Sequence, residues 1–310
     1  MNLKNTIIAL IVVLFIFQLI VSKQDAKALN AQIHDNKDKI NISVSTFSLY
    51  DISKHISENT TSINMILPFG VDAHSYEPSP KQVASFYDSD LVIYSGAGLE
   101  PWCKNFEFKH KVLDISKFVK LKELDLNHKH LHTNNTIDPH YWLDIDNMIR
   151  ATLIISDTMI KLRPKNKNIY EKNKHIYINM LKKLDKDYKK QLKNCKLDTI
   201  IVNHNAYSYL SSKYAFNVES LSGISPDSQT NAKNMISLIE HVKKDKVSTI
   251  FFESFASDKA IKSIALEAKV SVESLQPLGN ITADEAKLNL SYEDIMRINL
   301  NKISKALECK

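Results

Sequence analysis

Residues 168–192 read NIYEKNKHIYINMLKKLDKDYKKQL, and this stretch sets the plan of the whole chain. Its apolar side chains recur at helical spacing: Ile169, Ile176, Tyr177, Met180, Leu181, Leu184, Tyr188 and Leu192. Such a stripe predicts an amphipathic helix of about seven turns at 3.6 residues per turn. No glycine occurs between residues 138 and 222. We therefore expect a continuous, stiff helix that connects two halves of the chain.

On each side of this helix, strand-like and helix-like segments alternate. Strands are expected at residues 40–47, 62–69, 91–95, 111–115, 199–203, 217–221, 248–253 and 270–275. Helices are expected at residues 49–59, 146–163, 206–213, 228–243, 258–268 and 292–307, and a further one starts with Ser79 as N-cap and Gln82 closing a capping box. This alternation predicts parallel βαβ units.

The predicted fold class is α/β, with two lobes that each contain a mainly parallel sheet flanked by helices, joined by one long rigid helix. The N-terminal lobe spans residues 40–164, the connecting helix residues 165–195 and the C-terminal lobe residues 196–310. A length of 310 residues agrees with two domains of ordinary size.

Residues 1–28 have the pattern of a signal peptide. Lys4 provides the positive charge, residues 7–21 are apolar apart from Gln18, and Ala26 and Ala28 stand where a signal peptidase reads small side chains. We predict cleavage after Ala28 and a mature protein in the periplasm. The alternative is an uncleaved N-terminal membrane anchor. No cysteine follows the apolar run, which argues against a lipoprotein-type anchor.

The net charge of the chain does not indicate a nucleic-acid-binding function. The formal net charge is +6, but many of the lysines fall on residues 168–192, where a solvated helix face explains them. No nucleic-acid-binding module with interleaved aromatics is present, so nucleic acid is not an expected partner.

Cys103, Cys195 and Cys309 lack CxxC spacing and allow one disulfide. We prefer Cys195 with Cys309, because both fall in the predicted C-terminal lobe.

Three histidines are the candidate metal ligands. His74 lies in GVDAHSYEPSP (residues 70–80), His140 in IDPHYWL (137–143), and His204 opens HNAYSYL (204–210) after a predicted strand. Separations of 66 and 64 residues exclude a local zinc finger and suit ligands that converge from several strand ends. The alternative for each is a solvated or capped histidine at a strand end.

A second group of histidines lies close together in sequence. His128, His130 and His132 occur in NHKHLHTNN (residues 127–135). This polar stretch is interpreted either as an auxiliary loop that captures zinc weakly or as a solvated loop with incidental histidines. Ordering a flexible loop around an ion carries an entropic cost.

Six motifs, in this order, resemble those of the zinc-binding extracytoplasmic component of ABC metal importers, the ZnuA/TroA class of cluster A-I substrate-binding proteins. They are GVDAHSYEPSP (70–80), SGAGLEPW (95–102), DPHYWLD (138–144), NHNAYSYL (203–210), FFES (251–254) and QPLGN (276–280). The resemblance spans about residues 40–308. It implies metal in a cleft between two α/β lobes, with His74 and His140 as N-lobe ligands and His204 as the C-lobe ligand.

The chain departs from the family pattern at two positions. Gln276 stands where many relatives have an aspartate as fourth ligand, and Ala73 stands where some zinc relatives have an acid. The fourth position is therefore open to water, Gln276 or Glu253. Three nitrogen ligands favour zinc over manganese, which prefers carboxylate oxygen.

The resemblance implies a protein that binds Zn²⁺ as its metal, captures it outside the cytoplasm and delivers it to the membrane permease of an ABC importer. We expect a monomer without catalytic residues. A manganese or iron carrier on the same fold is one alternative. A secreted zinc hydrolase is another, since three histidines and a water also form a catalytic pattern, and Glu253 would be its only candidate general base.

Overall fold

The computed structural model describes residues 39–105, 111–124, 136–221, 236, 239–240, 242, 247–253 and 259–310. Residues 41–310 form one compact unit, which contains the three candidate histidines. The predicted signal peptide, the histidine-rich loop and most of the predicted helix at 228–243 lie outside the described residues. Among the helices that are described, none combines the length and the apolar character needed to cross a membrane.

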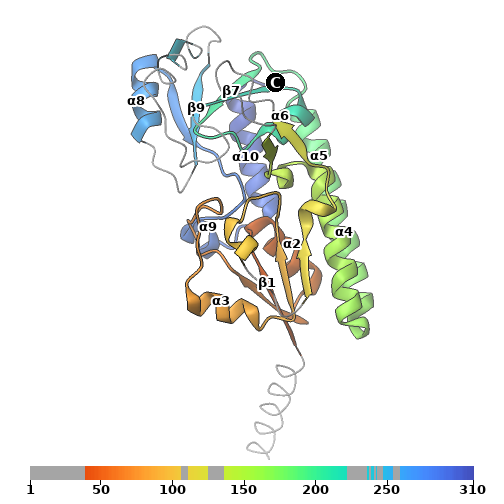
Figure 1. Ribbon diagram of the computed structural model, residues 1–310. Helices are drawn as coiled ribbons and strands as arrows, with labels where there is room; N and C mark the ends of the chain where they lie inside the picture. Colours follow the sequence, from red (N-terminus) through yellow and green to blue (C-terminus); the bar gives the residue numbers. More distant parts are fainter. Residues whose placement is uncertain are drawn as a thin grey trace, which may run out of the picture. The chain divides into compact units, whose positions relative to one another are not determined.

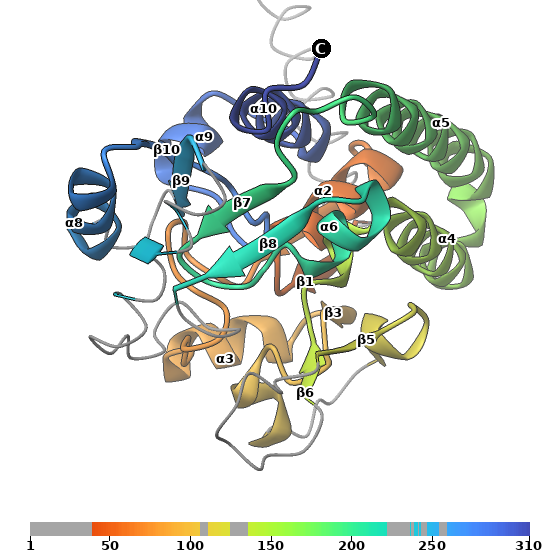
Figure 2. The same cartoon turned by 90° about the horizontal axis from the view of Figure 1, so that it is seen from above.

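Two four-stranded sheets with the same strand order form the framework of this unit (Figures 1 and 2). In the first sheet the order is β2 (Thr61–Met65), β1 (Ile40–Val44), β3 (Leu91–Tyr94) and β4 (Lys111–Asp114). In the second it is β8 (Asn217–Ser220), β7 (Thr199–Val202), β9 (Thr249–Phe252) and β10 (Ser271–Ser274).

Parallel pairing joins β1 to β3, β3 to β4, β7 to both β8 and β9, and β9 to β10. β1 therefore lies between β2 and β3, and β7 lies between β8 and β9. The predicted α/β class with two parallel sheets is confirmed.

Capping residues mark the starts of several helices. The helices are α2 (Phe47–Ser57), α3 (Pro80–Tyr87), α4 (Ile145–Leu162), α6 (Ser208–Tyr214), α8 (Lys259–Ala268), α9 (Ala283–Lys287) and α10 (Tyr292–Ala306). The predicted capping box at α3 is present, with the Ser79 side chain accepting from the backbone N–H of Gln82. Equivalent boxes start α9 at Thr282 and α10 at Ser291. Each box pairs donors that the first helical turn leaves without partners.

One pair of strands was absent from the sequence prediction. β5 (Lys122–Leu124) and β6 (Thr136–Asp138) pair antiparallel, and each has three residues, too few to show a period of two. This short ladder matters for the site, because β6 leads directly to His140.

The predicted long helix is α5 (Lys167–Gln191), with 25 residues. It lies beside α4 (Figures 1 and 2) and also bonds to helices of both halves. The hydroxyl of Tyr177 donates to Asp51 Oδ2 on α2 at 2.7 Å, and that of Tyr188 donates to the carbonyl of Met296 on α10 at 2.7 Å. The helix is thus buried along one face by elements from before and after it in the chain.

The buried face of α5 differs in part from the predicted stripe. Tyr177, Leu181, Leu184, Tyr188 and Leu192 are buried as predicted. The prediction was wrong for Ile169 and Ile176, which are 36% and 58% exposed.

Polar residues occupy part of the buried face of α5 instead. Asn173 donates to the carbonyl of Ile56, and Lys174 pairs with Glu171 at 2.6 Å. The position of α2 and α4, rather than apolar character alone, decides which side of α5 is covered.

The predicted disulfide is present. Cys195 follows α5, Cys309 follows α10, and the two are bonded, which confirms the preferred pairing. Cys103 is a free, half-buried thiol. The bond ties the end of the long helix to the end of the chain, beside backbone hydrogen bonds such as Leu197 N–H to Leu307 O.

Candidate metal centre

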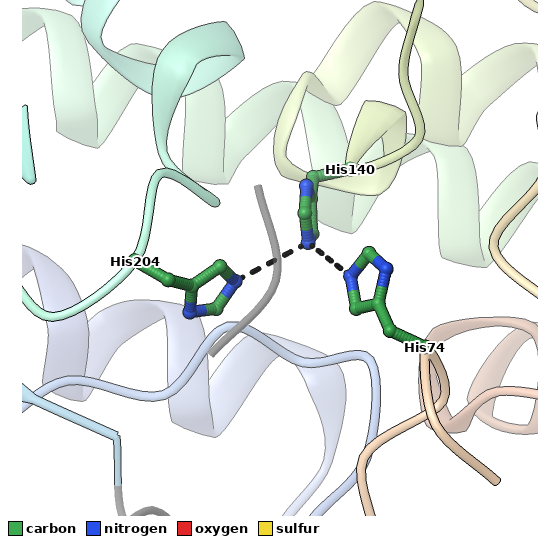
Figure 3. Close-up of side chains that lie close together, drawn as sticks. All are labelled: His74, His140 and His204. Carbon is green, nitrogen blue, oxygen red and sulfur yellow. Dashed lines mark hydrogen bonds between the residues drawn. The ribbon is translucent and has the colours of Figure 1, made fainter. Parts of the chain in front are cut away.

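His74, His140 and His204 come from three separate loops and meet at one point (Figure 3). His74 lies in the loop between β2 and α3, and His140 lies between β6 and a short 3-10 helix, Tyr141–Leu143. His204 comes two residues after β7. Since β7 has β8 on one side and β9 on the other, His204 stands where ligands of parallel α/β sheets bind, at the point where the strand order reverses.

Two spacings between the ring nitrogens fit a tetrahedral zinc ion. His140 Nε2 is 3.2 Å from His74 Nε2 and 3.4 Å from His204 Nε2, and all three ligand atoms lie within 4.8 Å of one another. Zn–N bonds of about 2.0–2.1 Å at tetrahedral angles require nitrogens about 3.3–3.4 Å apart. The three histidines line a cavity of about 20 Å³. That is room for about one water-sized particle.

The surroundings of His74 and His204 favour the neutral form of the imidazole ring. Burial, together with the nearby His140, lowers the pKa of His74 to about 3. Burial, together with the other two histidines, holds the pKa of His204 well below its usual range. A neutral imidazole keeps a lone pair for a metal, so these rings are ready to bind a cation without first losing a proton.

A carboxylate orients His140. Asp138 Oδ1 accepts from the ring Nδ1 of His140 at 2.8 Å and from its backbone N–H at 2.9 Å. Asp138 is fully buried, its Oδ2 accepts from the hydroxyl of Ser208, and its carbonyl accepts from Tyr209 at 2.9 Å. With the proton held on Nδ1, the lone pair of Nε2 points into the cavity, as in carboxylate–histidine–zinc arrangements.

A second carboxylate faces His204. Glu253, at the end of β9, is 1% exposed and its Oε1 contacts Nδ1 of His204. Its contact with the histidine ring turns the Nε2 of His204 toward the cavity. Glu253 also lines the cavity.

Gln276, the other amino acid considered for the fourth position, lies elsewhere. Its Nε2 donates to Glu285 Oε2 at 2.8 Å, and it is not among the residues that line the cavity. Its amide therefore supports the start of α9 and is not directed at the three histidines.

His74 is supported differently from the other two histidines. Asp72 Oδ1 accepts from its backbone N–H at 3.2 Å, but among the described residues no carboxylate is bonded to its ring. The orientation of this ring therefore depends on the path of its loop.

Sequence reasoning found the three histidines and Glu253 but assigned no role to Asp138. The signal was present, because an aspartate two residues before a histidine can accept from both its backbone and its ring. It was ambiguous, because Asp72 stands in the same relation to His74. The three histidines of the auxiliary loop lie outside the described residues.

Two similarly ordered parallel sheets and three converging histidines define a metal-binding protein of the α/β class. Residues 42–306 match the family model described as "Zinc-uptake complex component A periplasmic", and the chain belongs to this family. The family is one of transport components and not of enzymes.

Named relatives agree with this membership. The chain is 30% identical over 284 residues to the high-affinity zinc uptake system protein ZnuA of Bacillus subtilis, covering 88% of this chain and 89% of that protein. It is 29% identical over 287 residues to the zinc-binding lipoprotein AdcA of Streptococcus pneumoniae, covering 87% of this chain and 56% of AdcA. The chain thus spans little more than half of that longer relative.

A solved structure supports the fold. The Zn(II)-bound ZnuA-like domain of Streptococcus pneumoniae AdcA has a TM-score of 0.74 with this chain at 29% identity, covering 87% of this chain and 99% of that domain.

Proposed function

We propose that this protein captures Zn²⁺ outside the cytoplasm and delivers it to the membrane permease of an ABC importer. The observation that carries the proposal is the convergence of three imidazole Nε2 atoms on a cavity of about 20 Å³. In this proposal His74, His140 and His204 are the ligands and zinc is the cargo. Membership in a zinc-uptake family, and relatives named for zinc uptake and zinc binding, support the same conclusion.

The donor set favours zinc over manganese or iron. Three imidazole nitrogens suit zinc, whereas manganese prefers oxygen ligands. The nitrogen spacings of 3.2 and 3.4 Å match the tetrahedral geometry of zinc. The carboxyl groups of Asp138 and Glu253 are both buried beside the site. Of the three candidates for the fourth position, Gln276 bonds to Glu285 instead, which leaves water or Glu253.

The hydrolase alternative lacks support at the same site. A zinc hydrolase needs a general base that reaches the metal-bound water. Glu253 was the only candidate, and its Oε1 contacts Nδ1 of His204. A carboxylate in that position orients a ligand and raises its basicity, which serves binding.

The surroundings of the protein follow from the family and the N-terminal pattern. We propose an extracytoplasmic protein whose residues 1–28 are removed after Ala28, acting as a monomer with the permease as partner.

We further propose functional units at residues 40–164, 165–195 and 196–310, because β1–β4 precede α5 and β7–β10 follow it. The disulfide between Cys195 and Cys309 agrees with an oxidising compartment.

The test is a competition titration of the metal-free protein against a chromophoric chelator, with zinc and with manganese, followed by metal analysis of protein purified without added metal. We expect one tight zinc equivalent and much weaker manganese binding. Tighter binding of manganese than of zinc would overturn the choice of cargo. The absence of any tight equivalent of either metal would overturn the proposed function.

A further inference from the structure

One segment that follows the second sheet is tied to the loops that carry the histidines. We call residues 276–282 the strap; it connects β10 to α9. Its start is fixed on α10, where Asn299 accepts from the backbone N–H of Gln276 at 3.1 Å and donates to the carbonyl of Gln276 at 2.7 Å. The side chain of Gln276 donates to Glu285 Oε2 on α9, and the same oxygen accepts from the backbone N–H of Thr282 at 2.7 Å, so the strap is held at both of its ends by the second half of the chain.

From this base the strap reaches elements of the first half. Trp142 Nε1, two residues after His140, donates to the carbonyl of Pro277 at 2.7 Å. The first residue of α2, Phe47, donates its backbone N–H to the carbonyl of Gly279 at 2.9 Å. The approach at Gly279 is close, because a Cβ there would lie 3.3 Å from Cζ2 of Trp142. The strap is thus packed directly against Trp142, two residues after His140.

The next residue of the strap, Asn280, binds the loop that carries His74. It is 1% exposed, and its Nδ2 donates to the carbonyl of Pro68 at 2.6 Å and to that of Val71 at 2.8 Å. Its Oδ1 accepts from the backbone N–H of Ile281 at 2.8 Å. Both donors of the Asn280 amide are thereby used to hold the loop, and its oxygen accepts from the next residue of the strap.

Gly70 adds a backbone bond to the same contact, donating its N–H to the carbonyl of Ile281 at 2.9 Å. The His74 loop is therefore held over residues 68–71, immediately before Asp72 and His74. Asn280 and His74 both line the candidate metal cavity. In Figure 3 the ring of His74 approaches His140 from this loop, on the side opposite His204.

We propose that Asn280 is the positioning residue for His74, and that it acts through the backbone of the loop, whereas Asp138 and Glu253 act on the rings of the other two histidines. His74 has no described carboxylate on its ring, so the position of its Nε2 depends on the backbone of residues 68–74. Asn280 fixes that backbone through two carbonyls. The strap thereby couples the second half of the chain to the one ligand whose ring has no bonded carboxylate in the part of the chain that the structure describes. This inference rests on the proposed function, since it assumes that zinc binds the three histidines.

The test substitutes Asn280→Leu, which keeps a side chain of similar size and removes both donors. Outer-shell partners of metal ligands are worth about 10- to 100-fold in affinity. We expect a loss in this range, with a faster release of zinc to a chelator. Asn280→Ser, whose hydroxyl offers one donor on a shorter side chain, should lose less affinity and serves as the second variant should Asn280→Leu fail to fold.

The matched control is Asn173→Leu. Asn173 is also a buried asparagine whose Nδ2 donates twice to another segment, to the carbonyl of Ile56 at 3.1 Å and to Glu58 Oε1 at 2.9 Å. It contacts no part of the metal cavity. We expect Asn173→Leu to lower thermal stability and to leave zinc affinity unchanged, which separates loss of stability from loss of positioning.

A double-mutant cycle decides whether Asn280 acts through His74. In a His74→Ala background the Asn280→Leu change should have no further effect on zinc affinity, because the group that it positions is gone. An equal loss in both backgrounds, or full affinity in folded Asn280→Leu and Asn280→Ser variants, would overturn the inference. The wild-type titration comes first; if the wild type bound no zinc tightly, the proposed function would fail and not merely the role of Asn280.

Discussion

Residues 72–74 and 138–140 share one local pattern, an aspartate two positions before a histidine, yet the two sites differ. In both, the aspartate Oδ1 accepts the backbone N–H of the histidine, at 3.2 Å for His74 and 2.9 Å for His140. Only Asp138 also accepts from the histidine ring, at 2.8 Å. His74 instead has its loop held by the amide of Asn280.

The comparison teaches that one candidate site contains two kinds of support. Asp138 and Glu253 act directly on the rings of His140 and His204, and both carboxylates are buried. Among the described residues, none places a carboxylate on the ring of His74, whose support comes through its backbone, and His74 is the least buried of the three histidines. A carboxylate bonded to the ring fixes both the tautomer and the direction of the imidazole. Hydrogen bonds to the backbone fix only the position from which the side chain starts. We therefore expect His74 to be the first ligand to leave when zinc is released.

The largest effect is expected from removing a directly supported ligand. His140→Ala should lower zinc affinity by more than about 100-fold, since loss of an outer-shell partner alone costs about 10- to 100-fold. The fold should persist, because the two sheets and α5 form without contacts from this ring. A competition titration measures the affinity, and circular dichroism checks the fold.

The control for this change is His175→Ala, which removes an exposed histidine of α5 with a side chain that is 73% accessible. Its zinc affinity should equal that of the wild type. If His140→Ala bound zinc as tightly as this control, His140 would not be a ligand.

A smaller effect is expected from the paired aspartates, which test the comparison itself. Asp138→Asn keeps an oxygen for the ring of His140 and removes the charge, and we expect a loss of about 10-fold. Asp72→Asn keeps an acceptor for the backbone N–H of His74, and its loss should remain clearly below that of Asp138→Asn. Both affinities come from the same chelator titration.

Equal losses for the two aspartate variants would mean that both residues act through their charge on the ion, and the distinction between two kinds of support would be wrong. The Asp138→Asn effect should also disappear in a His140→Ala background, because the carboxylate then has no ligand to orient. An effect that persisted there would point to a role of Asp138 outside the metal site, for example at Ser208 or Tyr209.

The smallest effect on the tight site is expected from the auxiliary loop. Replacing His128, His130 and His132 together by asparagine should leave the tight equivalent unchanged and remove any weaker additional equivalents. The reason is that three histidines already converge with a spacing suited to zinc. Calorimetry resolves tight from weak equivalents, and loss of the tight one would show that this loop supplies a primary ligand.

Much of the fold was predictable because it depends on local patterns. The alternation of buried strands and amphipathic helices predicted both sheets and α5, and Ser79, Pro80 and Gln82 predicted the start of α3. The three histidines were likewise named as candidate ligands from local patterns, since each lies in a recognisable motif that follows a strand or precedes a turn. The pairing of Cys195 with Cys309 was predicted from their common lobe and is present.

The sequence by itself determined which residues were available to the site, and the tertiary structure decided how each is supported. Nothing local distinguishes Asp72 from Asp138, or identifies Asn280, which lies 212 and 209 residues from the two carbonyls that it binds. Ile176 fits the helical stripe but is exposed, because α5 is covered only on the side where α2, α4 and α10 pack. The physical reason is the same in each case: side-chain orientation and burial depend on segments that become neighbours only after the chain has folded.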